Sequence, residues 1–401
     1  MSHSLCNRIN KLLQNCINSI PVKAIACMGS ILFCVVPQAA PEADQLPPLG
    51  EWERTADSPL SPRNGANIWW HGNEIFVVGG SDFTCGSASM CLAPSTPPFS
   101  DGAAYNPEAN VWRKIADAPV SILGSEAATV GSDIFALVLA GYDSRSLRLF
   151  RYQPLLDKWD ELKLPEVMTE SRIVALGSDI IVYKGSHQDG FVSDWKLDTL
   201  TNQWSRIEDS PLGLGFNRQL ILHGHEMYLF DHELVPNPGG ESGPSYIRVA
   251  KLSQDQWQLL PRSEVIGSFP ILTAETLLVS PELGCADGGK VNGYDRCVAF
   301  GAVFDTTSNT WHELPNAPSR GMKNAQSSGG LSDNDLVLTK PGFPALNAIT
   351  GEWFVVPKLD STRYTQRVVK AAGPYGFAFG GTRSVINAGA VLLKDAWIWK
   401  P

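Results

Sequence analysis

A recurrent set of arginines is the feature of this sequence best suited to binding chemistry. Each arginine lies in a segment that leads into an expected strand, or at the start of that strand. The set consists of Arg63, Arg172, Arg218, Arg320 and Arg363, with Arg367 close behind. Guanidinium groups donate paired hydrogen bonds to carboxylates, so several of them converging on one place would bind an anionic ligand. Each arginine could instead pair with an acid or a backbone carbonyl of a neighbouring loop, as many surface charges do.

Two positions break the arginine pattern, because Glu126 and Ser268 lie near the corresponding places. A carboxylate among arginines can act as a general base, or it can simply be their counter-ion. Glu126 is therefore the candidate catalytic residue of an isomerase or mutarotase that acts on an acidic sugar. The chain has no phosphate-cradling glycine loop and no nucleophile elbow, so a role without catalysis is favoured.

The cysteines predict disulfide bonds. Four of the eight lie in the first 40 residues, and the other four form two close pairs, Cys85 with Cys91 and Cys285 with Cys297. Even numbers of cysteines in loop-like sequence are typical of disulfides outside the cytosol. A zinc site is disfavoured because neither pair has the two-residue spacing of a zinc knuckle.

The histidines do not predict a metal site. His223-Gly224-His225 has the composition of a metal-binding fragment, but it occupies the same kind of turn as His71-Gly72-Asn73. We interpret both segments as turn sequences. No metal and no cofactor is predicted.

The amino terminus has the pattern of an export signal. Lys23 precedes an apolar run over 24–36, which is followed by Pro37-Gln38-Ala39-Ala40-Pro41. The run is short for a membrane span, which needs about 20 residues. A signal that is not cleaved and serves as a membrane anchor is the alternative interpretation. We expect a signal over 1–40, a linker over 41–49 and an exported protein, periplasmic or secreted, without a membrane span in its mature part. The net charge of −9 disfavours nucleic acid as a partner.

One unit recurs along the chain: an apolar strand, a short polar turn, and a second strand that begins near a tryptophan. Tyr105 to Trp112 is the clearest copy. The repeated tryptophans are Trp52, Trp112, Trp159, Trp204, Trp257, Trp311 and Trp353. Their steps of 42 to 60 residues suit one four-stranded blade each. The sequence thus predicts an all-β chain.

These residues resemble the repeats of the kelch family. The count of seven repeats resembles the seven-bladed propeller of galactose oxidase. The resemblance covers about residues 50–401 and includes the Gly-Gly doublets Gly79-Gly80 and Gly380-Gly381. It implies a seven-bladed β-propeller in which the strand at Trp52 completes the last blade, whose final segment is 395–401. The copper site of galactose oxidase is not expected, because the two pairs account for the cysteines of the mature chain.

In this topology the long loops share one face, which we expect to be the functional one. Those loops carry the four paired cysteines and the aromatic residues Phe83, Phe99 and Tyr294. Three hypotheses follow. The favoured one is a module that binds a ligand or a protein, recognising a glycan, an acidic small molecule or an acidic peptide at the channel mouth, with another exported protein as a possible partner. The alternatives are the isomerase and a structural component of an extracellular assembly.

Overall fold

The computed structural model describes residues 45–401 with gaps. The described ranges are 45–84, 97–141, 146–223, 226–234, 247–253, 256–263, 270–272, 276–279, 284–285, 297–298, 302–313, 330–331, 336–338, 341–342, 344–359, 365–385 and 389–401. Within them the regular elements are strands, and no helix there is long and apolar enough to cross a membrane.

The first half of the described chain forms antiparallel four-stranded sheets from consecutive strands. One sheet contains β2 (Asn67–His71), β3 (Glu74–Val78), β4 (Gly102–Asn106) and β5 (Val111–Ile115). The next contains β6 (Gly124–Val130), β7 (Asp133–Leu139), β8 (Leu147–Gln153) and β9 (Lys158–Leu162). A third contains β10 (Ser171–Leu176), β11 (Asp179–Lys184), β12 (Trp195–Asp198) and β13 (Gln203–Arg206). A fourth contains β14 (Gly215–His223), β15 (Glu226–Glu233), β16 (Ile247–Ser253) and β17 (Gln256–Leu259).

The second half repeats this arrangement. One sheet contains β18 (Pro270–Leu272), β19 (Thr276–Val279), β22 (Ala302–Asp305) and β23 (Thr310–Glu313). Between them, β20 (Gly284–Cys285) and β21 (Cys297–Val298) form a separate two-stranded pair. Another sheet contains β24 (Gly330–Leu331), β25 (Leu336–Leu338), β26 (Pro344–Asn347) and β27 (Trp353–Val355). The last contains β28 (Thr365–Ala372), β29 (Tyr375–Val385), β30 (Gly389–Leu392), β31 (Ala396–Lys400) and, from the other end of the chain, β1 (Glu51–Arg54).

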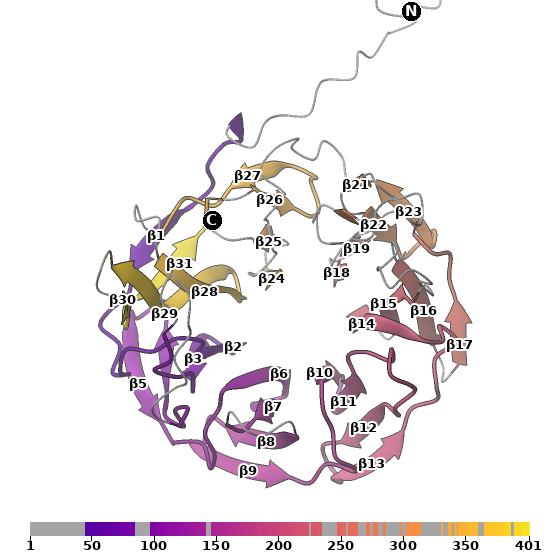
Figure 1. The fold of residues 1–401 in the computed structure, drawn as a ribbon, viewed down its shortest axis with the longest axis horizontal. Helices are drawn as coiled ribbons and strands as arrows, with labels where there is room; N and C mark the ends of the chain where they lie inside the picture. Colours follow the sequence, from indigo (N-terminus) through magenta and orange to yellow (C-terminus); the bar gives the residue numbers. More distant parts are fainter. Residues whose placement is uncertain are drawn as a thin grey trace, which may run out of the picture. The chain divides into compact units, whose positions relative to one another are not determined.

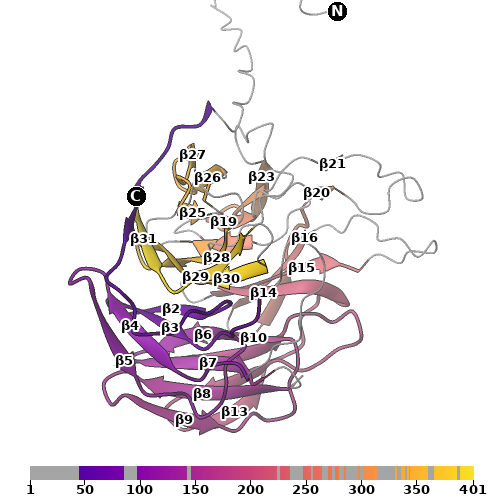
Figure 2. The same ribbon diagram turned by 60° about the vertical axis from the view of Figure 1, so that its left-hand side comes forward.

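The sheets follow one another around a centre, with their first strands innermost (Figure 1). The inner strands of successive sheets touch in the order β2, β6, β10, β14, β18, β24 and β28, and β28 touches β2. Within one sheet, β6, β7, β8 and β9 succeed one another from the inside to the outside, as the turned view also shows (Figure 2). This confirms the predicted all-β class and its antiparallel units, and is consistent with a β-propeller.

The repeated tryptophans link neighbouring sheets. Trp159 of β9 donates from Nε1 to the carbonyl of Ala116, at 2.9 Å, and Ala116 follows β5 of the preceding sheet. The equivalent bonds run from Trp112 to Ala56, from Trp204 to Lys163, from Trp257 to Glu208 and from Trp311 to Pro261. A tryptophan at this position thus ties the outer strand of one sheet to the outer strand of its neighbour.

The polar turn before each tryptophan strengthens the same link. Asp157 adopts a φ of 50°, and its Oδ1 accepts hydrogen bonds from Tyr152 at 2.6 Å and from the backbone N–H of Ala116 at 2.7 Å. Asn110 repeats this with Tyr105 and Ala56. Asn and Asp tolerate the left-handed conformation better than most residues, which explains their recurrence in the turn.

Candidate functional site

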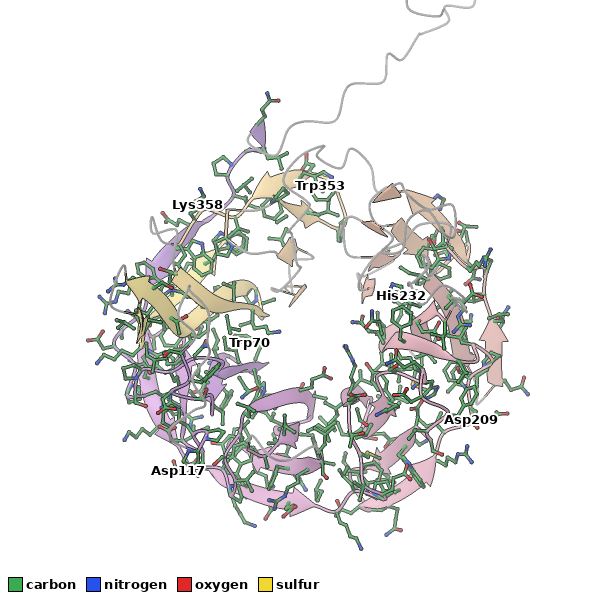
Figure 3. All side chains as sticks on the ribbon, viewed as in Figure 1. Trp70, Asp117, Asp209, His232, Trp353 and Lys358 are labelled. Atoms are coloured by element: carbon green, nitrogen blue, oxygen red, sulfur yellow. The ribbon has the colours of Figure 1, made fainter. Side chains whose placement is uncertain are left out.

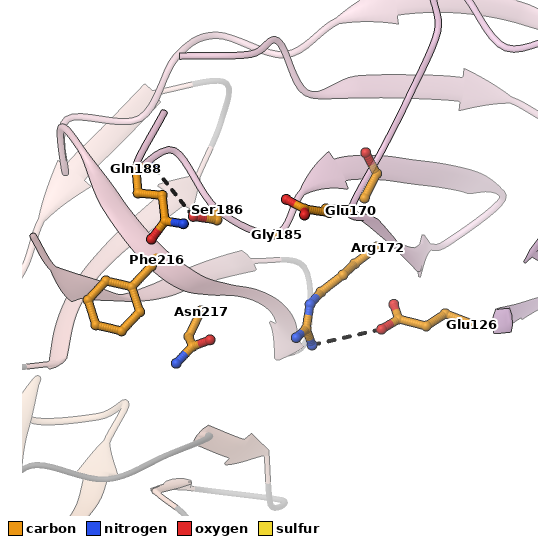
Figure 4. Close-up of a pocket in the computed structure, with 9 residues that line it drawn as sticks. Glu126, Glu170, Arg172, Gly185, Ser186, Gln188, Phe216 and Asn217 are labelled. Carbon is orange, nitrogen blue, oxygen red and sulfur yellow. Dashed lines mark hydrogen bonds and ion pairs between the residues drawn. The ribbon is translucent and has the colours of Figure 1, made fainter. Parts of the chain in front are cut away.

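A pocket of about 380 Å³ lies where β6, β10, the start of β14 and the loop after β11 meet. Its lining consists of Glu126, Glu170, Ser171, Arg172, Gly185, Ser186, Gln188, Phe216 and Asn217. Figure 4 shows Arg172 reaching toward Glu126, with Gln188, Phe216 and Asn217 on the far side of the guanidinium. The pocket therefore combines both signs of charge with amide, hydroxyl and aromatic groups.

Two strained backbone positions shape this pocket. Glu170 has a φ of 50° and Asn217 a φ of 51°. Among the described residues, the other non-glycine positions with positive φ are Asn110, Asp157, Asn202 and Asn309, each in the turn that precedes an outer strand. Glu170 and Asn217 belong to no such turn, and both line the pocket. Residues in sparsely populated backbone conformations often lie at functional sites, so their place here favours this pocket as the site.

A β-bulge in β14 presents the residues on one side. The pairing of β14 with β15 shifts register between Phe216 and Gln219. The bulge leaves Phe216 and Asn217 partly exposed in the pocket and turns the next residue, Arg218, into the interior, where it is 1% exposed. Bulges commonly re-aim side chains beside functional sites in this way.

The loop after β11 is fixed against β14. The N–H of His187 donates to Gly215 O at 2.7 Å, and the N–H of Arg218 donates to Gly185 O at 2.8 Å. The buried His187 ring has a lowered pKa, caused first by its burial, and its Nε2 lies 3.1 Å from the carbonyl oxygen of Val192. These contacts hold Ser186 and Gln188 at the pocket before any ligand arrives.

Arg172 and Glu126 form the charged side of the pocket. Arg172 Nη1 lies 3.9 Å from Glu126 Oε1, which is an ion pair too long for a hydrogen bond. Burial raises the pKa of Glu126, while Arg172, the N–H of Ile173 and Lys370 act in the opposite direction. A carboxyl group with a raised pKa beside a guanidinium can accept hydrogen bonds from a hydroxyl or exchange a proton with it.

Other arginines of the set are engaged inside the protein. Arg63, with 0% exposure, donates two hydrogen bonds to the Asp101 carboxylate at 2.6 and 2.9 Å, and lies over the ring of Phe99. Arg218 donates to Asp194 and to Lys184 O. Arg367 bonds to the carboxylate of Asp395 at 2.7 and 3.1 Å. Of the predicted ligand-binding arginines that the structure describes, Arg172 therefore remains as the candidate, because it lines the pocket.

Several predicted residues lie outside the described part of the chain. They are Arg320, Arg363, Ser268, Tyr294, Cys85 and Cys91. For the second cysteine pair the backbone is described, and the ladder places Cys285 directly opposite Cys297. Opposed residues of an antiparallel pair have Cα atoms about 4.5–5.5 Å apart, which a disulfide can span. Both disulfides stay predictions.

Sequence reasoning missed the uncharged side of the pocket. Gln188, Phe216 and Asn217 were not candidates, since no motif contains them. A weak signal existed in Asn217, because asparagine is depleted from strands and enriched where φ is positive.

The sequence of this chain is weakly similar to that of a known protein. Over 165 residues, or 40% of this chain, the sequence is 27% identical to Kelch-like protein 25 of Xenopus tropicalis. No family model matches the chain. The similarity suggests the kelch-repeat family. The matched segment spans about a quarter of the length of that relative. Together with the antiparallel sheets, a kelch-like relative suggests a protein-interaction module.

Proposed function

We propose that the chain is an exported, seven-bladed kelch-type β-propeller, closed where β1 completes the last blade. The pairing of β1 with β31, with Trp52 opposite Trp399, supports closure because it joins the first and the last of the described strands in one sheet. A sheet completed from both ends leaves no open junction in the ring. The export signal predicted over 1–40 and the close spacing of the cysteines in two pairs support secretion to an oxidising compartment.

We infer further that this module recognises a glycan at the Arg172 pocket. The observation that carries the proposal is the mixture of groups around one cavity. Glu126 and Glu170 balance Arg172, so the pocket offers acceptors as well as donors, and Lys184 Nζ lies 3.5 Å from Glu170. Sugar hydroxyls both donate and accept hydrogen bonds, whereas an acidic peptide offers its carboxylates as acceptors alone.

Phe216 and Arg172 would give the site its selectivity. The Phe216 ring is partly exposed in the pocket and stacks on the buried His232 ring at 5.2 Å, which fixes its plane. An aromatic face of this kind can cover the C–H face of a sugar ring. The guanidinium of Arg172 would favour a sugar that carries a carboxylate.

Arg172→Met is expected to weaken saccharide binding about tenfold or more, because a hydrogen bond to a charged group contributes roughly 1.5–3 kcal/mol. Calorimetric titration of residues 41–401 with galacturonic acid, galactose and an oligoglutamate peptide would measure the effect. Arg148→Met is the matched control, because Arg148 pairs with Glu161 on the exposed outer part of a sheet. If oligoglutamate binds and both sugars fail to bind, the glycan proposal is wrong and an acidic peptide takes its place.

A second candidate function is the isomerisation of an acidic sugar, and the placement of Glu126 favours it. Burial raises its pKa, and a carboxyl group beside the Arg172 guanidinium could give and take a proton. Exchange between the anomers of galacturonic acid, followed by NMR, should then be accelerated by the protein. Glu126→Gln should abolish that acceleration while leaving binding within a few-fold, and equal exchange rates with and without protein would exclude this activity.

A further inference from the structure

A second hollow of about 570 Å³ adjoins the first and has no role in the function proposed above. It is lined by the inner strands β2, β6, β10 and β28 and the residues that lead into them. Its polar and aromatic groups are Asn67, Trp69, Trp70, Ser125, Glu126, Thr129 and Lys370. Glu126 lines both hollows, so the two form one continuous surface along the inner strands.

Trp70 differs in its hydrogen bonding from ten of the other tryptophans. The indole N–H donates a hydrogen bond in Trp52, Trp69, Trp112, Trp159, Trp195, Trp204, Trp257, Trp311, Trp397 and Trp399. That of Trp70 donates none to any described residue, although the ring is partly buried. An amphipathic ring held in a hollow with a free donor is suited to a polar ligand.

The Trp70 ring is also held in a fixed plane. It packs edge-on to Tyr375 with ring centres 6.2 Å apart. It lies so close to Gly373, which has a φ of +58°, that a Cβ at that position would fall 2.3 Å from the ring. Trp70 points to the inner side of the ring of sheets, near β2 and β28 (Figure 3). A preorganised aromatic platform loses little conformational entropy on binding.

Lys370 supplies a positive charge to the same hollow. It is exposed, and among the described residues no hydrogen bond or ion pair engages its ammonium group. Most other charged residues of the inner strands are paired, as Arg367 is with Asp395 on the same strand. Lys370 acts on the Glu126 carboxylate only through space, so its ammonium group, in the same hollow as the indole, keeps its donors for a ligand with an acidic group.

We propose that this second hollow is a separate saccharide subsite, which binds an acidic sugar unit of a longer glycan between Trp70 and Lys370. The proposal rests on the proposed function and deepens it, since a glycan with one unit beside Arg172 would extend past Glu126 to this subsite. The face of the indole covers the C–H face of the sugar, while Lys370 binds the carboxylate. The protein thereby selects acidic oligosaccharides over single sugars.

The test is calorimetric titration of the protein with galacturonic acid and with its oligomers of increasing length, and with neutral malto-oligosaccharides as a second series. The wild-type protein should bind the acidic oligomers more tightly than the monomer. Lys370→Gln and Trp70→Phe should each weaken oligomer binding on the order of tenfold and leave monomer binding unchanged. Lys114→Gln, an exposed lysine of the outer strand β5, is the matched control.

The outcomes separate this inference from the function on which it rests. If Arg172→Met weakens every ligand and Lys370→Gln and Trp70→Phe weaken none, the second subsite is refuted and the Arg172 site stands. If Lys370→Gln weakens the oligomers and Arg172→Met has no effect, the subsite stands and the Arg172 site is refuted. If the wild-type protein binds no saccharide, both are refuted. A circular dichroism melt of each variant shows whether it is folded.

Discussion

Arg63→Met is expected to lower the free energy of unfolding by about 1.5–3 kcal/mol, because it removes a fully buried guanidinium that donates to a carboxylate, while Asp101, with 40% of its side chain exposed, is partly solvated by water after the loss. The side chain of Arg63 has 0% exposure, and its guanidinium makes two bonds to Asp101, one to Gly79 O and two to Ser61. Methionine would leave the Asp101 carboxylate without these donors. Urea unfolding followed by tryptophan fluorescence measures the change.

The size of this effect follows from what Arg63 joins. Its backbone N–H donates to Leu393 O, just after β30, and its carbonyl accepts from Gly381 N in β29 of the last sheet. Its side chain binds Asp101, just before β4 of the first sheet. Arg63 therefore connects two sheets at the junction where the chain ends meet. Loss of the guanidinium removes the two hydrogen bonds to Asp101, and with them the link from Arg63 to the first sheet.

The matched control is Arg148→Met. Arg148 makes an equally short two-bond pair with Glu161, but 38% of its side chain is exposed. Pairs of this kind contribute about 0–1 kcal/mol, since water solvates both charges when they separate. If Arg63→Met lowered the free energy of unfolding no more than Arg148→Met does, the burial of the arginine would not determine how much these ion pairs contribute to stability. Arg63→Met with Asp101→Leu should cost less than Arg63→Met alone, because no unpaired carboxylate is left.

The sequence predicted the repeating unit well because that unit is local. Tyr152, Asp157 and Trp159 lie within eight residues of one another, so their types and spacing alone predict a hairpin with a polar turn. The all-β class and the four-stranded antiparallel sheets are confirmed. The number of blades and the closure of the ring stay predictions.

The candidate site was harder to predict because its contacts are not local. Arg63, Arg172 and Arg218 occupy similar places in the repeat, yet Arg63 and Arg218 find carboxylates 38 and 24 residues away. Which arginine meets an aspartate depends on the path of a connecting loop, and strand alternation does not encode that path. The bulge at Phe216 and Asn217 is signalled in the sequence only by the asparagine, yet its one extra residue changes which side chains face the pocket.

Gly380→Ala is expected to lower the free energy of unfolding by about 2–5 kcal/mol, the second large effect in this chain. Gly380 has a φ of +56°, which costs a residue with a Cβ about 1–2 kcal/mol. A Cβ there would also lie 2.4 Å from the carbonyl oxygen of Arg63 and 3.1 Å from that of Leu393. Both obstacles are backbone atoms, so relief requires the strands to separate, at a further cost of about 1–3 kcal/mol.

Gly131→Ala separates the two contributions. Gly131 has nearly the same φ, +58°, but nothing lies within 4 Å of the place its Cβ would take. Its replacement should therefore cost only the conformational part, about 1–2 kcal/mol, in the same urea experiment. Equal losses for the two variants would mean that the Gly-Gly doublet is needed only for its φ angles. A larger loss for Gly380→Ala would show that the doublet is needed because the next segment of backbone passes directly over it.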